Sequence, residues 1–217
     1  GNAAAQHPQA AQLHAIAQWI AENTAAQFGY LTEAANTVGG YLANALPSTG
    51  VNAKALFEQP RKAYLLLHAE PEFDCADPQA ARAALEQAEM VVVMSPFKQG
   101  MDYADVLLPI APFSETSGTF VSAEGRAQGF NGTVRPLGDT RPGWKVLRVL
   151  GNLLTLDGFN YDSSEEIRNE VLGTKTLDSL DLSSRLNNRA NIKLEAPQPA
   201  QGLQRVADVP IYFSDAI

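Results

Sequence analysis

The chain has 217 residues, of which 45% are hydrophobic and 18% are charged, a composition typical of a globular protein. Sixteen Lys and Arg against 24 Asp and Glu give a formal net charge of −8. The basic residues form no block, which argues against a nucleic-acid surface, because phosphates are bound by clustered Lys and Arg. No apolar stretch reaches the roughly 20 residues of a membrane-spanning helix. The first residue is Gly1 rather than Met, so we expect a piece of a longer chain.

Metal chemistry has few ligands to draw on in this sequence. The single cysteine, Cys75, cannot close an internal disulfide and cannot supply the four thiolates that an iron–sulfur cluster usually needs. The three histidines are scattered and show no zinc spacing. We therefore expect no metal ligands in this chain.

Two segments precede the first expected strand. An apolar stripe at helical spacing predicts a helix over residues 8–27. The stripe consists of Leu13, Ile16, Ala17 and Ile20. Residues 31–46 form a second segment rich in small residues. We expect Gly39 and Gly40 to break or bend it, where backbone packs closely or takes a positive φ.

Three short apolar runs follow, at residues 63–68, 90–94 and 106–110. Such continuous runs are typical of parallel strands with helices on both faces of the sheet. Between the first two runs, Asp77 suits a helix N-cap and Pro78 suits the first helical turn. The order predicts an α/β fold with a Rossmann-like open, mostly parallel sheet flanked by helices and right-handed crossovers.

The rest of the chain is less regular. Residues 115–136 carry four glycines, which predicts extended loops and a β-hairpin lying over the sheet. A helix returns at 142–154, and Ser163 with Glu166 forms a capping box for a last helix. The polar residues beyond it predict an irregular, extended tail. We thus predict an N-terminal helical segment (1–30), an α/β domain (31–173) and a C-terminal tail (174–217).

The most informative stretch is ADVLLPIAPFSETSGTFVSAEGRAQ, residues 104–128. Its motifs, followed by a helix entered through an Arg- and Trp-containing segment, resemble the molybdopterin oxidoreductase family. The matching positions are Ala104, Asp105, Leu108, Pro109, Glu115, Gly118, Thr119, Glu124, Gly125, Arg126, Gln128, Pro136, Arg141 and Trp144. The sequence departs from the pattern at Ser122, where many cofactor-binding relatives carry Asn.

The resemblance implies a loop near the pterin cofactor of the molybdenum-containing relatives. This pterin-side loop consists of Glu115, Gly118, Thr119, Glu124, Gly125, Arg126 and Gln128. An arginine such as Arg126 can bind a phosphate or a carboxylate through two hydrogen bonds. The commoner alternative is that Glu115, Glu124 and Arg126 form ion pairs that anchor the loop. We expect a vestigial loop that binds no cofactor, and no catalytic residue in this chain.

Further stretches resemble the large iron–sulfur-carrying chain of bacterial NADH-quinone oxidoreductase, respiratory complex I. They are residues 31–42, 60–75 and 208–217. This resemblance implies a scaffold in the peripheral arm, which passes electrons from NADH to quinone through iron–sulfur clusters. It also implies 4Fe-4S and 2Fe-2S clusters elsewhere in the full-length chain and other peripheral-arm proteins as partners. The expected location is peripheral, at the cytoplasmic side of the bacterial inner membrane, without membrane insertion.

Two alternatives stay open. The chain could be a fragment of a molybdopterin-dependent oxidoreductase such as a formate dehydrogenase. Those enzymes usually end in a β-barrel, whereas the residues after Gly173 show no strand pattern. It could also be a nucleotide-binding module that uses the crevice at the carboxyl ends of its strands, near residues 70–73 and 95–99.

Overall fold

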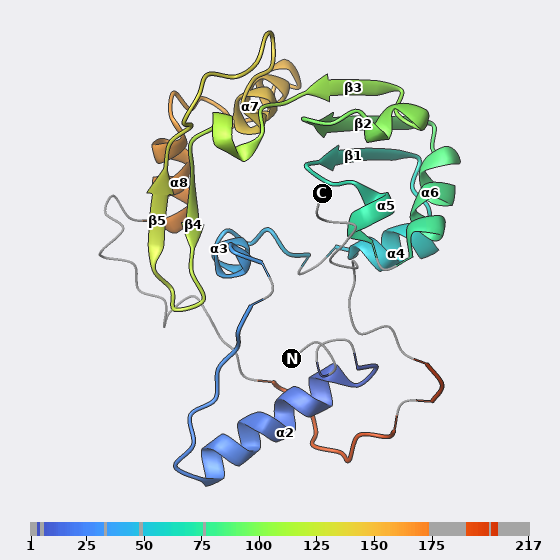
Figure 1. Cartoon of the computed structure of the whole chain (residues 1–217), viewed down its shortest axis with the longest axis vertical. Coiled ribbons are helices and arrows are strands. Elements are labelled where there is room, and N and C mark those ends of the chain that lie inside the picture. The colour runs from blue at the N-terminus through green and yellow to red at the C-terminus, as the bar shows by residue number, and fades with distance from the viewer. Residues whose placement is uncertain are drawn as a thin grey trace. The chain divides into compact units, whose positions relative to one another are not determined.

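The computed structural model describes residues 4, 7–32, 34–47, 50–75, 77–173, 190–199 and 201–203 (Figure 1). The chain divides into two compact units. The first combines residues 1–34 with residues 181–217, and the second comprises residues 35–180. Within the described residues, no helix is long and apolar enough to cross a lipid bilayer.

The first unit contains one described helix, α2 (Ala10–Asn23), which confirms the predicted N-terminal helix. Glutamine side chains hold an extended segment, residues 190–198, alongside it. Gln18 Oε1 accepts from Ala190 N at 2.8 Å, and Gln12 Nε2 donates to Lys193 O at 2.9 Å. Residues 190–199 and 201–203 of the predicted tail contain no helix or strand. The rest of residues 174–217, including the stretch 208–217, lies outside the described residues.

The second unit is built on a parallel sheet, which confirms the predicted α/β fold. Its strands are β1 (Ala63–Leu67), β2 (Met90–Ser95) and β3 (Val106–Pro109), in the order β1-β2-β3 (Figure 1). The three predicted apolar runs form these strands. Asp105 fixes the register at the start of β3, because its Oδ2 accepts from Val91 N at 2.6 Å and its own N–H donates to Val91 O at 2.9 Å.

Three short helices precede β2 in this unit: α4 (Ala53–Glu58) lies before β1 in the chain, and α5 (Pro71–Asp74) and α6 (Pro78–Glu86) lie between β1 and β2. The predicted cap of α6 is confirmed: Asp77 Oδ1 accepts from Ala80 N at 2.9 Å, and Pro78 opens the helix. The core on this side of the sheet consists of Tyr64, Ala84, Leu85, Val91 and Val93. Burying a side chain such as Leu85 stabilises the fold by roughly 1.5–3 kcal/mol.

Helix α3 (Thr37–Leu42) includes both Gly39 and Gly40, so the expected break is wrong. Neither glycine is among the residues with positive φ. Gly39 is required because the Asn36 side chain lies so close that a Cβ at position 39 would overlap its amide. A Cβ on Gly40 would meet nothing within 4 Å. Asn36 Oδ1 in turn accepts from the buried Val121 N at 2.8 Å.

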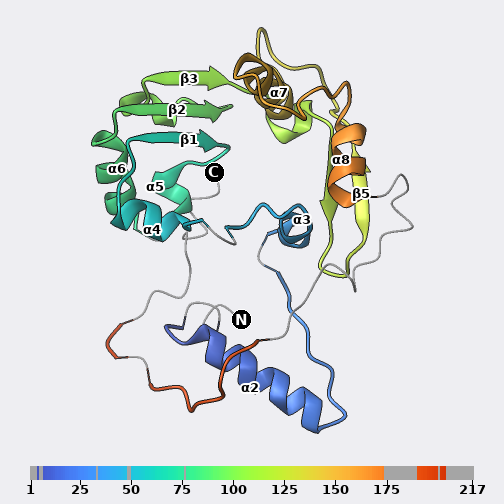
Figure 2. The same cartoon turned by 180° about the vertical axis from the view of Figure 1, so that it is seen from behind.

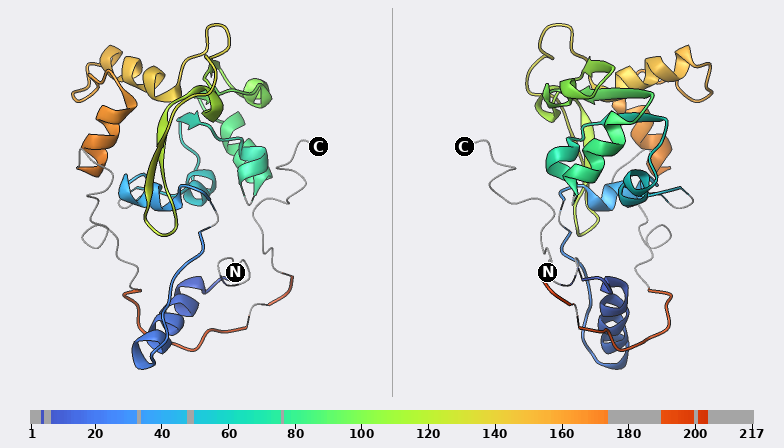
Figure 3. Two further views of the ribbon diagram at one scale, coloured as in Figure 1. Left: turned by 60° about the vertical axis from the view of Figure 1, so that its left-hand side comes forward. Right: turned by 90° about the vertical axis from the view of Figure 1, so that its right-hand side faces the viewer.

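Strands β4 (Gly118–Val121) and β5 (Ala127–Phe130) form the predicted hairpin, with Gly125 at φ 85° in its turn. The hairpin does not lie over the parallel sheet. It packs against α3 and α8 (Ser164–Leu172), as Figures 2 and 3 show. Gly118 allows this pairing to close, because a Cβ there would lie 2.6 Å from Phe130 Cζ.

The last two helices of the second unit are α7 (Gly143–Leu153) and α8. The predicted capping box of α8 is confirmed, since Ser163 Oγ accepts from Glu166 N at 3.2 Å. The Glu166 carboxylate reaches back one residue further than expected and accepts from Asp162 N at 2.8 Å. Gly173, at φ 63°, ends the helix in the left-handed conformation that glycine favours.

The Asn36 contact gives a matched pair of stability predictions. Gly39→Ala should lower the free energy of unfolding by about 1–3 kcal/mol, because displacing Asn36 leaves the buried Val121 N–H without its acceptor. Gly40→Ala should be neutral or stabilise by up to about 1 kcal/mol, because alanine favours the helix. Urea denaturation measures both, and equal effects of the two substitutions would contradict the assignment of Asn36.

Candidate functional site

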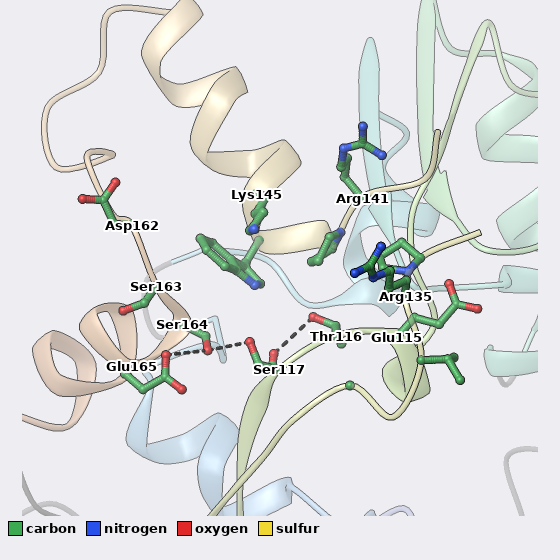
Figure 4. Close-up of a pocket in the computed structure, with 15 residues that line it drawn as sticks. Glu115, Thr116, Ser117, Arg135, Arg141, Lys145, Asp162, Ser163, Ser164 and Glu165 are labelled. Atoms are coloured by element: carbon green, nitrogen blue, oxygen red, sulfur yellow. Dashed lines mark hydrogen bonds between the residues drawn. The ribbon is translucent and has the colours of Figure 1, made fainter. Parts of the chain in front are cut away.

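A cavity of about 620 Å³ opens within the second unit (Figure 4). Three stretches of chain form its wall: the entry to β4, the segment that leads into α7, and the first turn of α8. The lining residues are Glu115, Thr116, Ser117, Gly132, Val134, Arg135, Pro136, Arg141, Pro142, Trp144, Lys145, Asp162, Ser163, Ser164 and Glu165.

Hydrogen bonds hold the segment 132–137 against the 3₁₀ turn η2 (Phe113–Glu115). Thr133 N donates to Ser114 O at 2.8 Å, and Leu137 N donates to Glu115 Oε2 at 3.0 Å. A Cβ on Gly132 would lie 2.9 Å from the Glu115 carbonyl carbon, so only glycine fits here. This wall of the cavity is therefore set by backbone contacts together with the Glu115 carboxylate.

The opposite wall is tied to the hairpin through two hydroxyl groups. Ser117 Oγ and Ser164 Oγ lie 2.7 Å apart, which joins β4 to the first turn of α8. Ser164 also donates to Glu165 Oε2 at 3.2 Å. Figure 4 shows Ser163, Ser164 and Glu165 on this side, with Arg135 and Arg141 across the cavity.

The cationic and anionic side chains that line the cavity are equal in number. Arg135, Arg141 and Lys145 are its cations, and Glu115, Asp162 and Glu165 its carboxylates. Two helix N-termini also meet the cavity, and the partial positive charge of such ends attracts anions. Two of the three carboxylates, Asp162 and Glu165, flank the start of α8, whereas the N-cap of α7 is Pro142, which provides no side-chain cap. The α7 end is therefore the better place for an anion.

An unused donor adds to this end of the cavity. Among the described residues, Trp144 Nε1 is buried and has no hydrogen-bond partner. A buried N–H without an acceptor costs roughly 1–3 kcal/mol, so it marks a place where a ligand oxygen would be stabilising. Lys145 Nζ lies 5.3 Å from the centre of the Trp144 ring, which keeps a cation beside this donor.

Only part of the pterin-side loop lies at the cavity. Glu115 lines the cavity, and Gly118 and Thr119 lie in β4 beside it. Glu124, Gly125 and Arg126 form the hairpin turn and Gln128 lies in β5, none of them in the cavity wall. Arg126 serves the turn through its backbone, since its N–H donates to Ser122 Oγ at 3.2 Å. In the described part of the chain, no ion pair joins Glu124 or Arg126 to another side chain.

Several cavity residues are not among the predicted site residues. Arg135, Lys145 and the serines 163 and 164 reach the cavity from segments that are far apart in the sequence. Arg141 and Trp144 match the family motif, but the motif alone assigns them no role in a site. The signal that could have found them is the run of cations, Arg135, Arg141 and Lys145, around the entry to a helix.

The profile of the molybdopterin oxidoreductase family matches residues 1–153. This chain belongs to the molybdopterin oxidoreductase family. The match covers the parallel sheet, the hairpin and most of the cavity wall, but not α8. The match confirms the predicted resemblance to this family. In the motif stretch, Asp105 holds β2 and β3 in register and Glu115 lines the cavity.

Two relatives are named as putative formate dehydrogenases. The protein of Staphylococcus aureus (strain MRSA252) is 38% identical over 91 residues, and that of Staphylococcus haemolyticus (strain JCSC1435) is 37% identical over 93 residues. Each match covers 42% of this chain and 9% of the relative, so the chain matches only a small part of these proteins. Acetylene hydratase from Pelobacter acetylenicus superposes with a TM-score of 0.48 and 18% identity, over 69% of this chain and 24% of that one.

The donors in the cavity suit the phosphate of a pterin cofactor better than its metal ion. Guanidinium groups, an uncapped helix end and the buried Trp144 N–H are donors suited to a phosphate. The described residues offer no comparable set of metal ligands, because no cluster of three His, Cys, Asp or Glu occurs among them. Burial, with Asp74 and Glu72 nearby, raises the pKa of the Cys75 thiol, which disfavours the thiolate that binds metals.

A second polar group lies at the carboxyl end of β1. His68 has a positive φ of 51°, which is uncommon for a residue other than glycine, and its backbone N–H donates to Met94 O at 3.0 Å. A Cβ on Gly143 would lie 3.5 Å from His68 Nε2, so the imidazole packs on the first turn of α7. Partial burial lowers the pKa of His68 below its usual 6.5.

This shift predicts a pH dependence of stability. Because the folded state favours neutral His68, the unfolded state binds the proton more readily, and stability should fall as the pH drops below about 6.5. His68→Asn, which tolerates the positive φ, should flatten this part of the profile. Chemical denaturation between pH 8 and pH 5 measures it, with His7→Asn in the first unit as the control; unchanged slopes in both variants would contradict the role of His68.

Proposed function

We propose that this chain is part of a molybdopterin-dependent oxidoreductase of the formate dehydrogenase type, and that its second unit forms one wall of the cofactor site. Family membership over residues 1–153 carries the proposal. The names of the relatives support formate as the class of substrate, and a cavity with an anion-binding end supports a role in holding the cofactor. The chain would act within a longer polypeptide, because it matches only 9% of these relatives.

When bound, the cofactor would supply a metal centre that accepts two electrons from the substrate. The residues of this chain would bind and orient its organic part. Arg141 and the first turn of α7 would hold a phosphate, since a guanidinium and a helix N-terminus both bind such anions. Trp144 Nε1 would donate to an oxygen of the same group. Asp162 and Glu165, across the cavity, would accept from ring N–H groups of the pterin.

A scaffold role in complex I is the second candidate. Two observations favour a scaffold without bound pterin: Glu124 and Arg126 lie in the hairpin turn outside the cavity, and the Glu115 carboxylate is already bound to Leu137 N. A loop that satisfies itself in this way needs no pterin. In this case the iron–sulfur clusters would lie in other parts of the full-length chain. Other proteins of the peripheral arm would be the partners, at the cytoplasmic side of the inner membrane.

Molybdenum and pterin content separates the two candidates. The longer polypeptide, purified from its native host, should contain about one molybdenum per chain, measured by plasma mass spectrometry, and an oxidised pterin with its characteristic fluorescence. The double substitution Arg141→Ala and Lys145→Ala should weaken pterin retention by at least about a hundredfold, because it removes two charged hydrogen bonds that contribute roughly 1.5–3 kcal/mol each.

A matched control is Lys54→Ala, which removes an exposed cation on α4 that pairs with Glu58. It should leave pterin retention unchanged. Wild-type protein that contains iron and sulfide but no molybdenum or pterin would reject the first candidate. Co-purification with an NADH-oxidising protein in that sample would then support the scaffold.

A further inference from the structure

One dipeptide beside the cavity brings together two groups that can react with each other. Asn131 is the only asparagine of the sequence that is followed by glycine. The side-chain carbon of an asparagine lies within reach of the next backbone nitrogen, and a glycine at that next position gives the least steric hindrance because it has no Cβ. The pair follows β5, which ends at Phe130, and Gly132 lines the cavity.

Packing requires the glycine of this pair. Gly132 is not among the residues with positive φ, so turn geometry does not demand it. A Cβ at this position would lie 2.9 Å from the carbonyl carbon of Glu115 and 3.0 Å from Thr116 N, and these are backbone atoms that cannot rotate away. The cavity wall therefore excludes every residue whose side chain would shield the Gly132 nitrogen.

Neither reacting group is engaged elsewhere. Asn131 and Gly132 are both exposed. In the described part of the chain, the Asn131 side chain has no hydrogen-bond partner and the Gly132 N–H donates to no acceptor. Backbone hydrogen bonds resume at Thr133, whose N–H donates to Ser114 O at 2.8 Å. The two residues thus form a short joint between the end of β5 and this hydrogen bond.

We propose that Asn131 is a site of spontaneous deamidation. The Gly132 N–H loses its proton to hydroxide, and the nitrogen attacks Cγ of Asn131. The Cγ–Nδ2 bond breaks, and the departing nitrogen takes a proton from water and leaves as ammonia. Water then opens the cyclic imide at one carbonyl to give aspartate, or at the other to give isoaspartate, in which the main chain runs through Cγ. Each product replaces a neutral amide by a carboxylate, a covalent change that alters the local electrostatics.

Isoaspartate changes the geometry of the cavity wall as well as its charge. It adds one main-chain methylene group ahead of Gly132, where packing against Glu115 leaves no room even for a Cβ. The N–H groups of Thr133 and Leu137, which donate to η2, lie just beyond this point. Formation of isoaspartate therefore releases the segment 132–137 from η2. Neither the reaction nor the release requires the function proposed for the cavity.

Ageing of the purified protein tests the site. The longer polypeptide from the native host is kept in mildly alkaline buffer at physiological temperature, and deamidation of each asparagine is followed by peptide mass spectrometry. Asn131 should react at least about tenfold faster than Asn160, because the side chain of Tyr161 shields the nitrogen that follows Asn160. Asn160 is a matched internal control, since it is exposed and its side chain has no hydrogen-bond partner among the described residues.

A variant assigns the product to this position. Asn131→Gln should abolish the isoaspartate that isoaspartyl methyltransferase detects, because glutamine would have to close a larger ring. Equal rates at Asn131 and Asn160 would overturn the proposal. Reaction of Asn131 about tenfold or more slowly in the folded protein than in urea-unfolded protein would do the same, because the native structure would then protect the dipeptide. Reaction at a similar rate in both states supports it.

Hydrogen exchange tests the release of the cavity wall. In the fraction that contains isoaspartate, the amides of Thr133 and Leu137 should exchange at least about tenfold faster than in fresh protein. Asn131→Asp is the matched control, because it adds the carboxylate without the extra methylene group, and it should keep both amides protected. Unchanged exchange in the isoaspartate fraction would overturn the proposed release, and an equal loss of protection in Asn131→Asp would reject the role of the methylene group.

Discussion

The register between β2 and β3 determines where the cavity forms. The paired hydrogen bonds between Asp105 and Val91 set this register at the amino end of β3. The strand then ends at Pro109, and Ile110 bridges to Arg141 in parallel, with Ala111 N donating to Arg141 O at 2.9 Å. A shift of one residue in β3 would reverse its side chains and move both η2 and the start of α7. The cavity therefore depends on this strand pair, although neither strand lines it.

Hydrogen bonds and one close backbone contact, rather than apolar packing, hold the cavity wall in place. Gly132 lies against the backbone of Glu115, and Leu137 N is bound by the Glu115 carboxylate. The Glu115 carboxylate, which the family motif would offer to a ligand, is therefore already hydrogen-bonded within the protein. The groups left for a ligand are those at the start of α7, where Arg141, Lys145 and the buried Trp144 N–H lie. The chemistry of this site thus differs from what the loop motif implies by itself.

Family and function rest on different kinds of observation. A match over residues 1–153 establishes the family, and the same fold can serve an enzyme or a scaffold. The cavity supports cofactor binding through its donors, whereas the hairpin turn carries Glu124 and Arg126 away from it.

The sequence by itself determined the strands, the helix caps and the family. The apolar runs of β1, β2 and β3, the Asp77 cap and the Ser163 capping box act locally, over a few residues, so their pattern is readable in one dimension. The tertiary structure decided what depends on contacts between distant segments. It placed the hairpin against α3 and α8, let α3 continue through Gly39, and joined Arg135, Lys145 and Ser164 around one cavity. Such contacts link residues far apart in the chain, and no local propensity or periodicity records them.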